Sequence, residues 1–345
     1  MEVSNLKHKK LYMFIIFIIT IFMLWFLLKD HYVEIWGVIQ NANYFYIALA
    51  IILYFIYLLL DVLMYSSITK MYTDKISIWY QLYLGLIGKF FSGITPLATG
   101  GQPMQVYELK KKGVSVSNGT NIAIQSYMVF QISLMILATF AIILNKAIKL
   151  FAPVPFLAEL TLIGFIINFG ILIVLLCISF SKNFNRTIVR FFINILCKIK
   201  IVKNKKESIS KWNKRCDEYY ENAQVLMHHK IVLVKCIILE LIALLVCYMI
   251  PLVLAYALGL GSNITWYASL AASSYIFIMG CYVPIPGATG GMEFAFTGFF
   301  GNFIFGYQLN TLVVIWRFIT YYLPVIAGAI VFNIKHNRET KPITE

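Results

Sequence analysis

Long apolar runs alternate with short polar segments along most of the chain. Each run approaches or reaches the ~20 residues that an α-helix needs to cross the hydrocarbon core of a bilayer. Helices satisfy every backbone amide within one lipid-exposed segment, and the alternating polarity of an outer-membrane barrel is absent. The pattern predicts an all-α, polytopic membrane protein with six full transmembrane helices, over Leu11–Leu28, Phe45–Ile68, Ile122–Leu144, Leu162–Phe180, Ile231–Leu258 and Thr311–Phe332.

Basic residues assign sides to these helices, because Lys and Arg gather in cytoplasmic loops. The stretch Ile78–Leu97 lies between two basic clusters, Lys70–Lys75 and Lys110–Lys112, so it is expected to enter the membrane and return to the same side. With the basic tail inside, Trp266–Val283 and Met292–Phe305 together form a second re-entrant hairpin, entering from the opposite side. Both termini are then cytoplasmic, and a count that includes the hairpins gives 7–8 segments.

The tips of the two hairpins carry one repeated sequence. Pro96-Leu97-Ala98-Thr99-Gly100-Gly101-Gln102 and Pro286-Gly287-Ala288-Thr289-Gly290-Gly291-Met292 are identical at five of seven positions. Proline ends the incoming helix, the glycine pair allows positive φ and close backbone approach, and threonine is expected to cap the outgoing helix. Paired breaks of this kind in the two halves of a chain indicate the binding site of a transporter. The alternative is that both are ordinary surface turns that resemble each other by chance.

Two helix N-termini aimed at the middle of the membrane suit a phosphate or carboxylate, since each carries partial positive charge and free N–H donors. The candidate substrate-binding residues are therefore those of the two tips and the acidic residue just after the second: Pro96, Thr99, Gly100, Gly101, Gln102, Pro286, Thr289, Gly290, Gly291 and Glu293.

Charged residues within the apolar stretches are the second group of candidates: Asp61, Lys89, Glu240, Glu293 and Arg317. A central Asp, Lys or Arg costs ~2.5–3.5 kcal/mol on insertion scales, so each needs a role or a partner. Glu293 is expected in the first turn of a helix, as a headgroup contact or proton relay or as a structural cap, with Arg317 as its counter-charge. Asp61 and Glu240 are expected to pair inside the bundle.

Composition agrees with one membrane domain over residues 1–345, with 60% hydrophobic and 13% charged residues and a net charge of +14. The most basic segment, 182–230, is a cytoplasmic segment that sets topology or forms helices on the anionic leaflet; tRNA binding is the third interpretation. The six cysteines lack metal-ligand spacing, and no nucleotide-binding or hydrolase motif occurs. We therefore expect no catalytic residue, metal or cofactor.

From end to end the chain resembles the lysylphosphatidylglycerol synthase transmembrane, or flippase-like, family, which forms the N-terminal membrane module of the multiple peptide resistance factor and also occurs alone. The resemblance rests on Ile94–Pro103 running on to Tyr107–Gly113, and on Val283–Glu293. Many members carry an acidic residue and then an arginine after the first glycine pair, where this chain has Gln102 and Gln105. The resemblance thus leaves the headgroup open.

The resemblance implies ATP-independent flipping of an anionic or aminoacylated phospholipid, such as lysyl-phosphatidylglycerol, across the cell membrane, and a link to antibiotic resistance. Full-length relatives add a cytosolic domain that takes lysine from lysyl-tRNA, and we expect this chain to stop at Glu345 without it. The family name nonetheless implies a phosphatidylglycerol lysyltransferase, with lysyl-tRNA as partner. A small-solute secondary transporter is the third alternative, and a homodimer is left open.

Overall fold

The computed structural model describes residues 32–151, 154–198, 229–281 and 283–339, and within 207–225 only residues 207–210, 212, 213, 217, 220, 221, 224 and 225. Every regular element in these residues is helical. They are α2 (Tyr32–Gln40), α3 (Tyr44–Thr69), α4 (Ile78–Gly93), η1 (Pro96–Ala98), α5 (Gly101–Lys111), α6 (Val116–Ile148), α7 (Pro155–Phe180), α8 (Lys182–Lys198), α10 (Lys230–Ala257), η2 (Gly261–Asn263), α11 (Trp266–Gly280), η3 (Pro286–Ala288), α12 (Gly291–Phe300), α13 (Gly306–Arg317), the π-turn η4 (Phe318–Tyr322) and α14 (Leu323–Glu339).

Five helical stretches are long and apolar enough to cross a membrane: Tyr44–Thr69, Val116–Ile148, Pro155–Cys177, Lys230–Ala257 and Gly306–Lys335. They coincide with five of the six predicted spans, and the all-α class is confirmed. The observed helices run past the apolar runs, because polar residues start them. Ser115, for example, begins α6 by accepting a hydrogen bond from the Asn118 amide at 3.1 Å. The predicted first span, Leu11–Leu28, lies outside the described residues.

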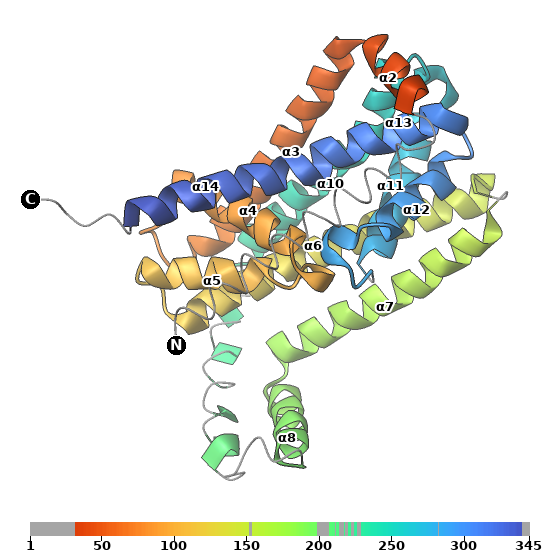
Figure 1. Cartoon of the computed structure of the whole chain (residues 1–345). Coiled ribbons are helices and arrows are strands. Elements are labelled where there is room, and N and C mark those ends of the chain that lie inside the picture. The colour runs from red at the N-terminus through yellow and green to blue at the C-terminus, as the bar shows by residue number, and fades with distance from the viewer. Residues whose placement is uncertain are drawn as a thin grey trace, which may run out of the picture.

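The core forms where α10 packs against α3 and where α6, α11, α12 and α13 close around it (Figure 1). Tyr248, Leu244 and Leu254 of α10 are fully buried there, and Phe296 and Phe299 of α12 are equally inaccessible. Lipid tails are as apolar as these side chains, so van der Waals packing rather than exclusion from water holds the helices together here. The core therefore holds the elements that carry the tips at fixed positions.

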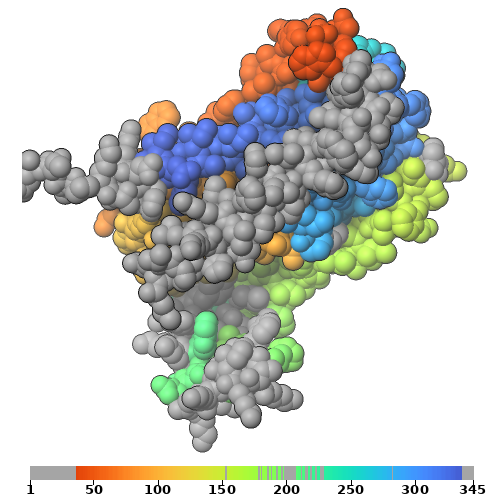
Figure 2. All heavy atoms as spheres, viewed as in Figure 1, coloured from red at the N-terminus to blue at the C-terminus, as the bar shows by residue number. Residues whose placement is uncertain are grey.

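The outer faces of α3 and α7 are apolar. Phe55 on α3 and Ile166 on α7 are 53% and 68% exposed, with more apolar residues beside them on each helix. Figure 2 shows side chains of α3, α14 and α7 at the surface of the bundle. Apolar patches of this extent in a helical bundle mark contact with lipid.

Two helical hairpins interrupt the series of long helices. The first packs α4 against α5 and the second packs α11 against α12, with the turns η1 and η3 between the paired helices. In Figure 1 the hairpins approach from opposite sides of the molecule, and η1 lies against η3 in the middle. The two repeated sequences thus meet at one place.

Helix α8 projects from the end of α7, away from the bundle (Figure 1). It presents Phe191, which is 61% exposed, and Arg186 of this helix pairs with Asp217 at 2.7 Å. The rest of the basic segment is described only in short pieces. Its placement on the anionic leaflet stays a prediction.

A buried carboxylate fixes the first hairpin to the end of the last span. Glu108 on α5 is 1% exposed and accepts hydrogen bonds from Lys111 at 2.8 Å and from Lys335 on α14 at 2.5 Å. Tyr80 on α4 donates to the same carboxylate at 3.1 Å. Burial acts to raise the pKa of Glu108, but the two ammonium groups outweigh it and hold that pKa below its usual value of 4.5. The contacts favour the charged carboxylate.

Replacing Glu108 by Gln is expected to destabilise the protein by about 1–3 kcal/mol at neutral pH, because the ammonium groups lose their shared charged acceptor. Since the folded state lowers this pKa, the contribution is complete at neutral pH and is lost as the pH falls through the folded-state value, below 4.5. Thermal unfolding in detergent should therefore separate wild type from Glu108→Gln at pH 7 and bring them together at acid pH. Glu159→Gln, at an exposed site on α7, is the matched control. A gap that persists unchanged in acid would contradict this assignment.

Candidate functional site

The two tips begin on the same backbone path, with positive φ at Leu97 and Ala98 in the first and at Gly287 and Ala288 in the second. In each, the proline opens a 3-10 turn, and the threonine three residues later donates its hydroxyl to the proline carbonyl. That bond measures 2.9 Å for Thr99 and 2.8 Å for Thr289. The repeated sequence therefore encodes a repeated turn, and the two paths separate after it, where ψ is -11° at Thr99 and 140° at Thr289.

The expected threonine caps are wrong. Gly100 and Gly290 occupy the N-cap positions of α5 and α12, since the threonine hydroxyls are already bonded within the turns. The Gly100 amide instead donates to Thr95 Oγ1 at 2.8 Å, and the Gly290 amide donates to Glu293 Oε2 at 2.7 Å. Glu293 is thus a structural cap for α12, whatever else it does.

The glycine pair was expected to supply positive φ, and this holds only at Gly290, with φ of 84°. In the first tip the left-handed positions fall on Leu97 and Ala98, both at φ 54°. Non-glycine residues in this region store strain of about 1–3 kcal/mol each and persist only where surrounding packing holds them. Gly101 serves close approach instead: a Cβ there would fall 2.7 Å from the carbonyl oxygen of Gly88 on α4.

A tyrosine of the π-turn joins the two hairpins. The Tyr321 hydroxyl donates to the Gly93 carbonyl at 3.0 Å, at the end of α4. Its ring lies so close to Gly287 of the second tip that any Cβ there would overlap it. π-turns occur frequently at functional sites, and this one places a single side chain against the end of α4 and the second tip.

Glu293 and Arg317 form a buried ion pair beside the second tip. Arg317 Nε donates to Glu293 Oε1 at 2.6 Å, and the two residues are 4% and 5% exposed. Arg317 Nη2 also donates to the Gly287 carbonyl at 2.9 Å. The counter-charge expected from the sequence is therefore present, and both carboxylate oxygens of Glu293 are engaged.

The other charged residues that the sequence predicts within the membrane gather nearby. Lys89 Nζ lies 3.0 Å from Asp61 Oδ2 and donates to the Tyr57 hydroxyl at 2.7 Å. Glu240 is 1% exposed and lies within electrostatic range of both charges. Asp61 thus pairs with Lys89, and no hydrogen bond joins Asp61 to Glu240 in the described part of the chain.

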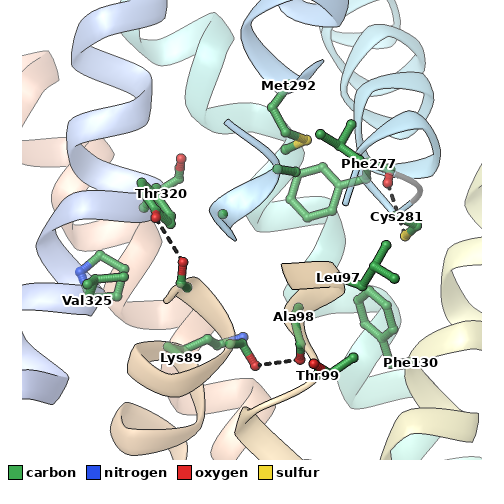
Figure 3. A pocket seen from close by; sticks show the side chains of 18 of the residues that line it. Lys89, Leu97, Ala98, Thr99, Phe130, Phe277, Cys281, Met292, Thr320 and Val325 are labelled. Atoms are coloured by element: carbon green, nitrogen blue, oxygen red, sulfur yellow. Dashed lines mark hydrogen bonds between the residues drawn. The ribbon is translucent and has the colours of Figure 1, made fainter. Parts of the chain in front are cut away.

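A cavity of about 650 Å³ lies where the tips meet. The first turns of both outgoing helices line it, through Gln102 on α5 and Met292 on α12, and so do the cationic side chains Lys89 and Arg317. Figure 3 shows Leu97 beside Phe130 on one wall, with Thr320 and Val325 on the opposite wall. We call this space the tip cavity.

Not every predicted site residue lines the tip cavity. Thr99, Gln102, Lys89 and Arg317 line it directly. The remaining tip residues shape the backbone around it, and Glu293 acts on it through Arg317. Asp61, Glu240 and Gly101 line a smaller neighbouring cavity.

Sequence reasoning missed the aromatic walls of the tip cavity: Tyr54, Tyr57, Tyr127, Phe130, Phe277, Trp316 and Tyr321. Aromatic residues are frequent throughout this chain, so their number marked no position. A usable signal existed only for Tyr321, which lies four residues after the charged Arg317 on the same helical stretch and stacks on it at 4.5 Å.

Comparison with known proteins adds two findings. The sequence profile described as "Lysylphosphatidylglycerol synthase TM region" matches residues 13–328. A UPF0104 membrane protein of Archaeoglobus fulgidus is 25% identical over 309 residues, covering 86% of this chain and 89% of that protein. The profile match includes both tips, the first four long helical stretches and most of the fifth.

Proposed function

The chain belongs to the family of lysylphosphatidylglycerol synthase transmembrane regions, and from that premise we propose that it flips a phospholipid across the cytoplasmic membrane without ATP. The proposed cargo is an anionic or aminoacylated phospholipid such as lysyl-phosphatidylglycerol, or another lipid-linked headgroup. The proposal has both termini in the cytoplasm and the two hairpins entering the membrane from opposite faces.

The tip cavity is the observation that carries this proposal. It is bordered by two broken helices, and irregular backbone at membrane depth is tolerated where it lines a cavity or is buried in protein. The positive ends of α5 and α12 both border it, and such ends favour anions. A phosphodiester fits this chemistry.

The walls of the cavity suit the rest of a lipid headgroup region. Most lining side chains are aromatic or aliphatic, while Lys89, Arg317, Thr99 and Gln102 supply a few polar contacts. Small-molecule sites combine an apolar lining with few, placed polar groups in this way. The headgroup can therefore cross between the tips while the acyl chains stay in lipid.

The test is lipid movement in protein-containing liposomes without nucleotide. Labelled phosphatidylglycerol and lysyl-phosphatidylglycerol should equilibrate between leaflets faster than in protein-free liposomes and faster than labelled phosphatidylcholine. Unchanged transfer of both lipids would refute the flippase. Uptake of a soluble solute without lipid movement would favour a small-solute carrier, and transfer of lysine from lysyl-tRNA to lipid would favour the synthase.

A further inference from the structure

A second cavity of about 280 Å³ adjoins the tip cavity, with which it shares Lys89, Gln102 and Tyr57 among its lining residues. It lies between α3, α4, α5, α6 and α10. Its charged lining consists of Asp61, Lys89 and Glu240. We call it the carboxyl cavity.

Glu240 is an unusual carboxyl group in this cavity. It is 1% exposed on an apolar span, and its Oε2 has no hydrogen-bond partner among the described residues. Lys89, the cation that lines this cavity, is already paired with Asp61. A buried carboxylate without a counter-charge of its own costs several kcal/mol, so Glu240 is held neutral, with a proton, in this conformation. A neutral carboxyl inside a cavity is a store for one proton.

The same cavity contains other polar atoms that need partners. The Tyr65 hydroxyl and both amide atoms of Gln81 line it and are also without partners in the described part of the chain. Buried polar atoms of this kind are normally satisfied by ordered water where the space is large enough, and this cavity is. Water gives the carboxyl groups a route for proton exchange.

Lys89 belongs to both cavities. It pairs with Asp61 at 3.0 Å, and their side chains are 30% and 24% exposed. This pair is therefore easier to separate than the buried pair of Glu293 and Arg317. With Glu240 neutral, the charged residues that line the two cavities, together with Glu293, sum to zero. The empty site is electrically balanced.

An anionic headgroup changes that balance. It adds one negative charge to a low-dielectric site, and Lys89 can turn from Asp61 to the phosphate. Asp61 then loses its counter-charge. A hydronium ion of the bulk solvent gives up its proton, which reaches the Asp61 carboxylate through cavity water and forms an O–H bond there; Lys89 remains an ammonium group, and the occupied site is neutral again.

We propose that Asp61 and Glu240 form a proton-binding site that takes up one proton when an anionic headgroup binds in the tip cavity. The proposal rests on the proposed function only in taking that anion to be a phospholipid headgroup. Glu293 is not the acceptor, since the Gly290 amide and Arg317 hold both of its oxygens.

Other titratable groups surround the site. They are Tyr54, Tyr57 and Tyr65 on α3, Lys89 on α4, Tyr127 on α6, and Cys236, Cys247 and Tyr248 on α10, in addition to the two carboxyl groups. Arg317 at the end of α13 lines the tip cavity and not this one. Tyrosine and cysteine are neutral at physiological pH, so Lys89 and the carboxyl groups control the charge.

The first experiment measures protons directly. Short-chain phosphatidylglycerol is added to purified protein in neutral detergent and weak buffer, with a pH-sensitive dye reporting uptake and calorimetry reporting binding. Wild type and Glu159→Gln, which alters an exposed carboxyl on α7, should take up close to one proton per lipid bound. Asp61→Asn should bind the lipid with uptake reduced severalfold. Binding without proton uptake in wild type, or binding that requires sodium and ignores pH, would overturn the proposal.

The second experiment does not need the lipid. Infrared difference spectra between neutral and alkaline pH should show a protonated carboxyl band that Glu240→Gln removes and Glu159→Gln leaves in place. A wild-type spectrum without that band overturns the proton site even if lipid is flipped. The band together with no binding of phosphatidylglycerol supports the proton site and refutes the lipid assignment alone.

Discussion

Glu293→Gln is expected to abolish most transport and to lower the free energy of unfolding by about 3–5 kcal/mol, the usual cost of leaving one member of a buried ion pair alone. The Arg317 guanidinium would remain in a site where it is 4% exposed, without its carboxylate. Arg317→Gln leaves the opposite charge and should be equally harmful. Thermal unfolding in detergent and the liposome assay measure the two effects.

The double variant Glu293→Gln with Arg317→Gln separates stability from transport. It removes both charges, so unfolding should return toward wild type, because a neutral pair carries no uncompensated charge. Transport should stay low, since Arg317 lines the tip cavity. If stability and transport both recovered, the ion pair would have a structural role only. Arg186→Gln on α8 is the matched control, because it breaks the more exposed pair that Arg186 forms with Asp217. It should change unfolding and transport far less.

Gly101→Ala is expected to lower transport severalfold and the free energy of unfolding by about 1–3 kcal/mol, the usual cost of overpacking. The new methyl would meet both the Ser92 hydroxyl and the Gly88 carbonyl, and a backbone atom cannot turn aside. Moving α5 away from α4 shifts its N-terminus at the tip cavity.

Gly170→Ala on α7 is the control of identical chemistry. A Cβ there meets nothing within 4 Å, so the change should be neutral or stabilise the helix by about 0.5–1 kcal/mol. Equal effects of the two substitutions, in the same unfolding and transport assays, would contradict the close approach of α4 and α5.

The sequence was most informative where one physical cost dominates. Long apolar runs have few alternatives to crossing a membrane, so the long helices were predictable. A buried Arg317 needs a counter-charge, and Glu293 was the carboxylate with a fixed place near a tip. The two tips could be matched because they share residues at five of seven positions.

The details of the site depended on contacts that no local pattern specifies. Leu97 and Ala98 take positive φ although glycines follow, in the turn where η1 lies against η3 of the second hairpin. Lys89 pairs with Asp61 rather than with Glu240 because of the register of α4 on α3, which periodicity does not fix. Glu108 lies in the motif Tyr107–Gly113, yet its partner Lys335 is 227 residues away along the chain.

The π-turn Phe318–Tyr322 limits which changes in chain length the last span can accept. One residue turns an α-helix by about 100°, so deleting any residue of this turn would rotate all of α14 relative to α13. Lys335 would then leave Glu108, and Tyr321 could not stay against both Gly93 and Gly287. A single substitution in this turn alters one side chain and keeps the register of α14. Deleting one codon would break the contact of α14 with Glu108 and the contact of Tyr321 with Gly93 together.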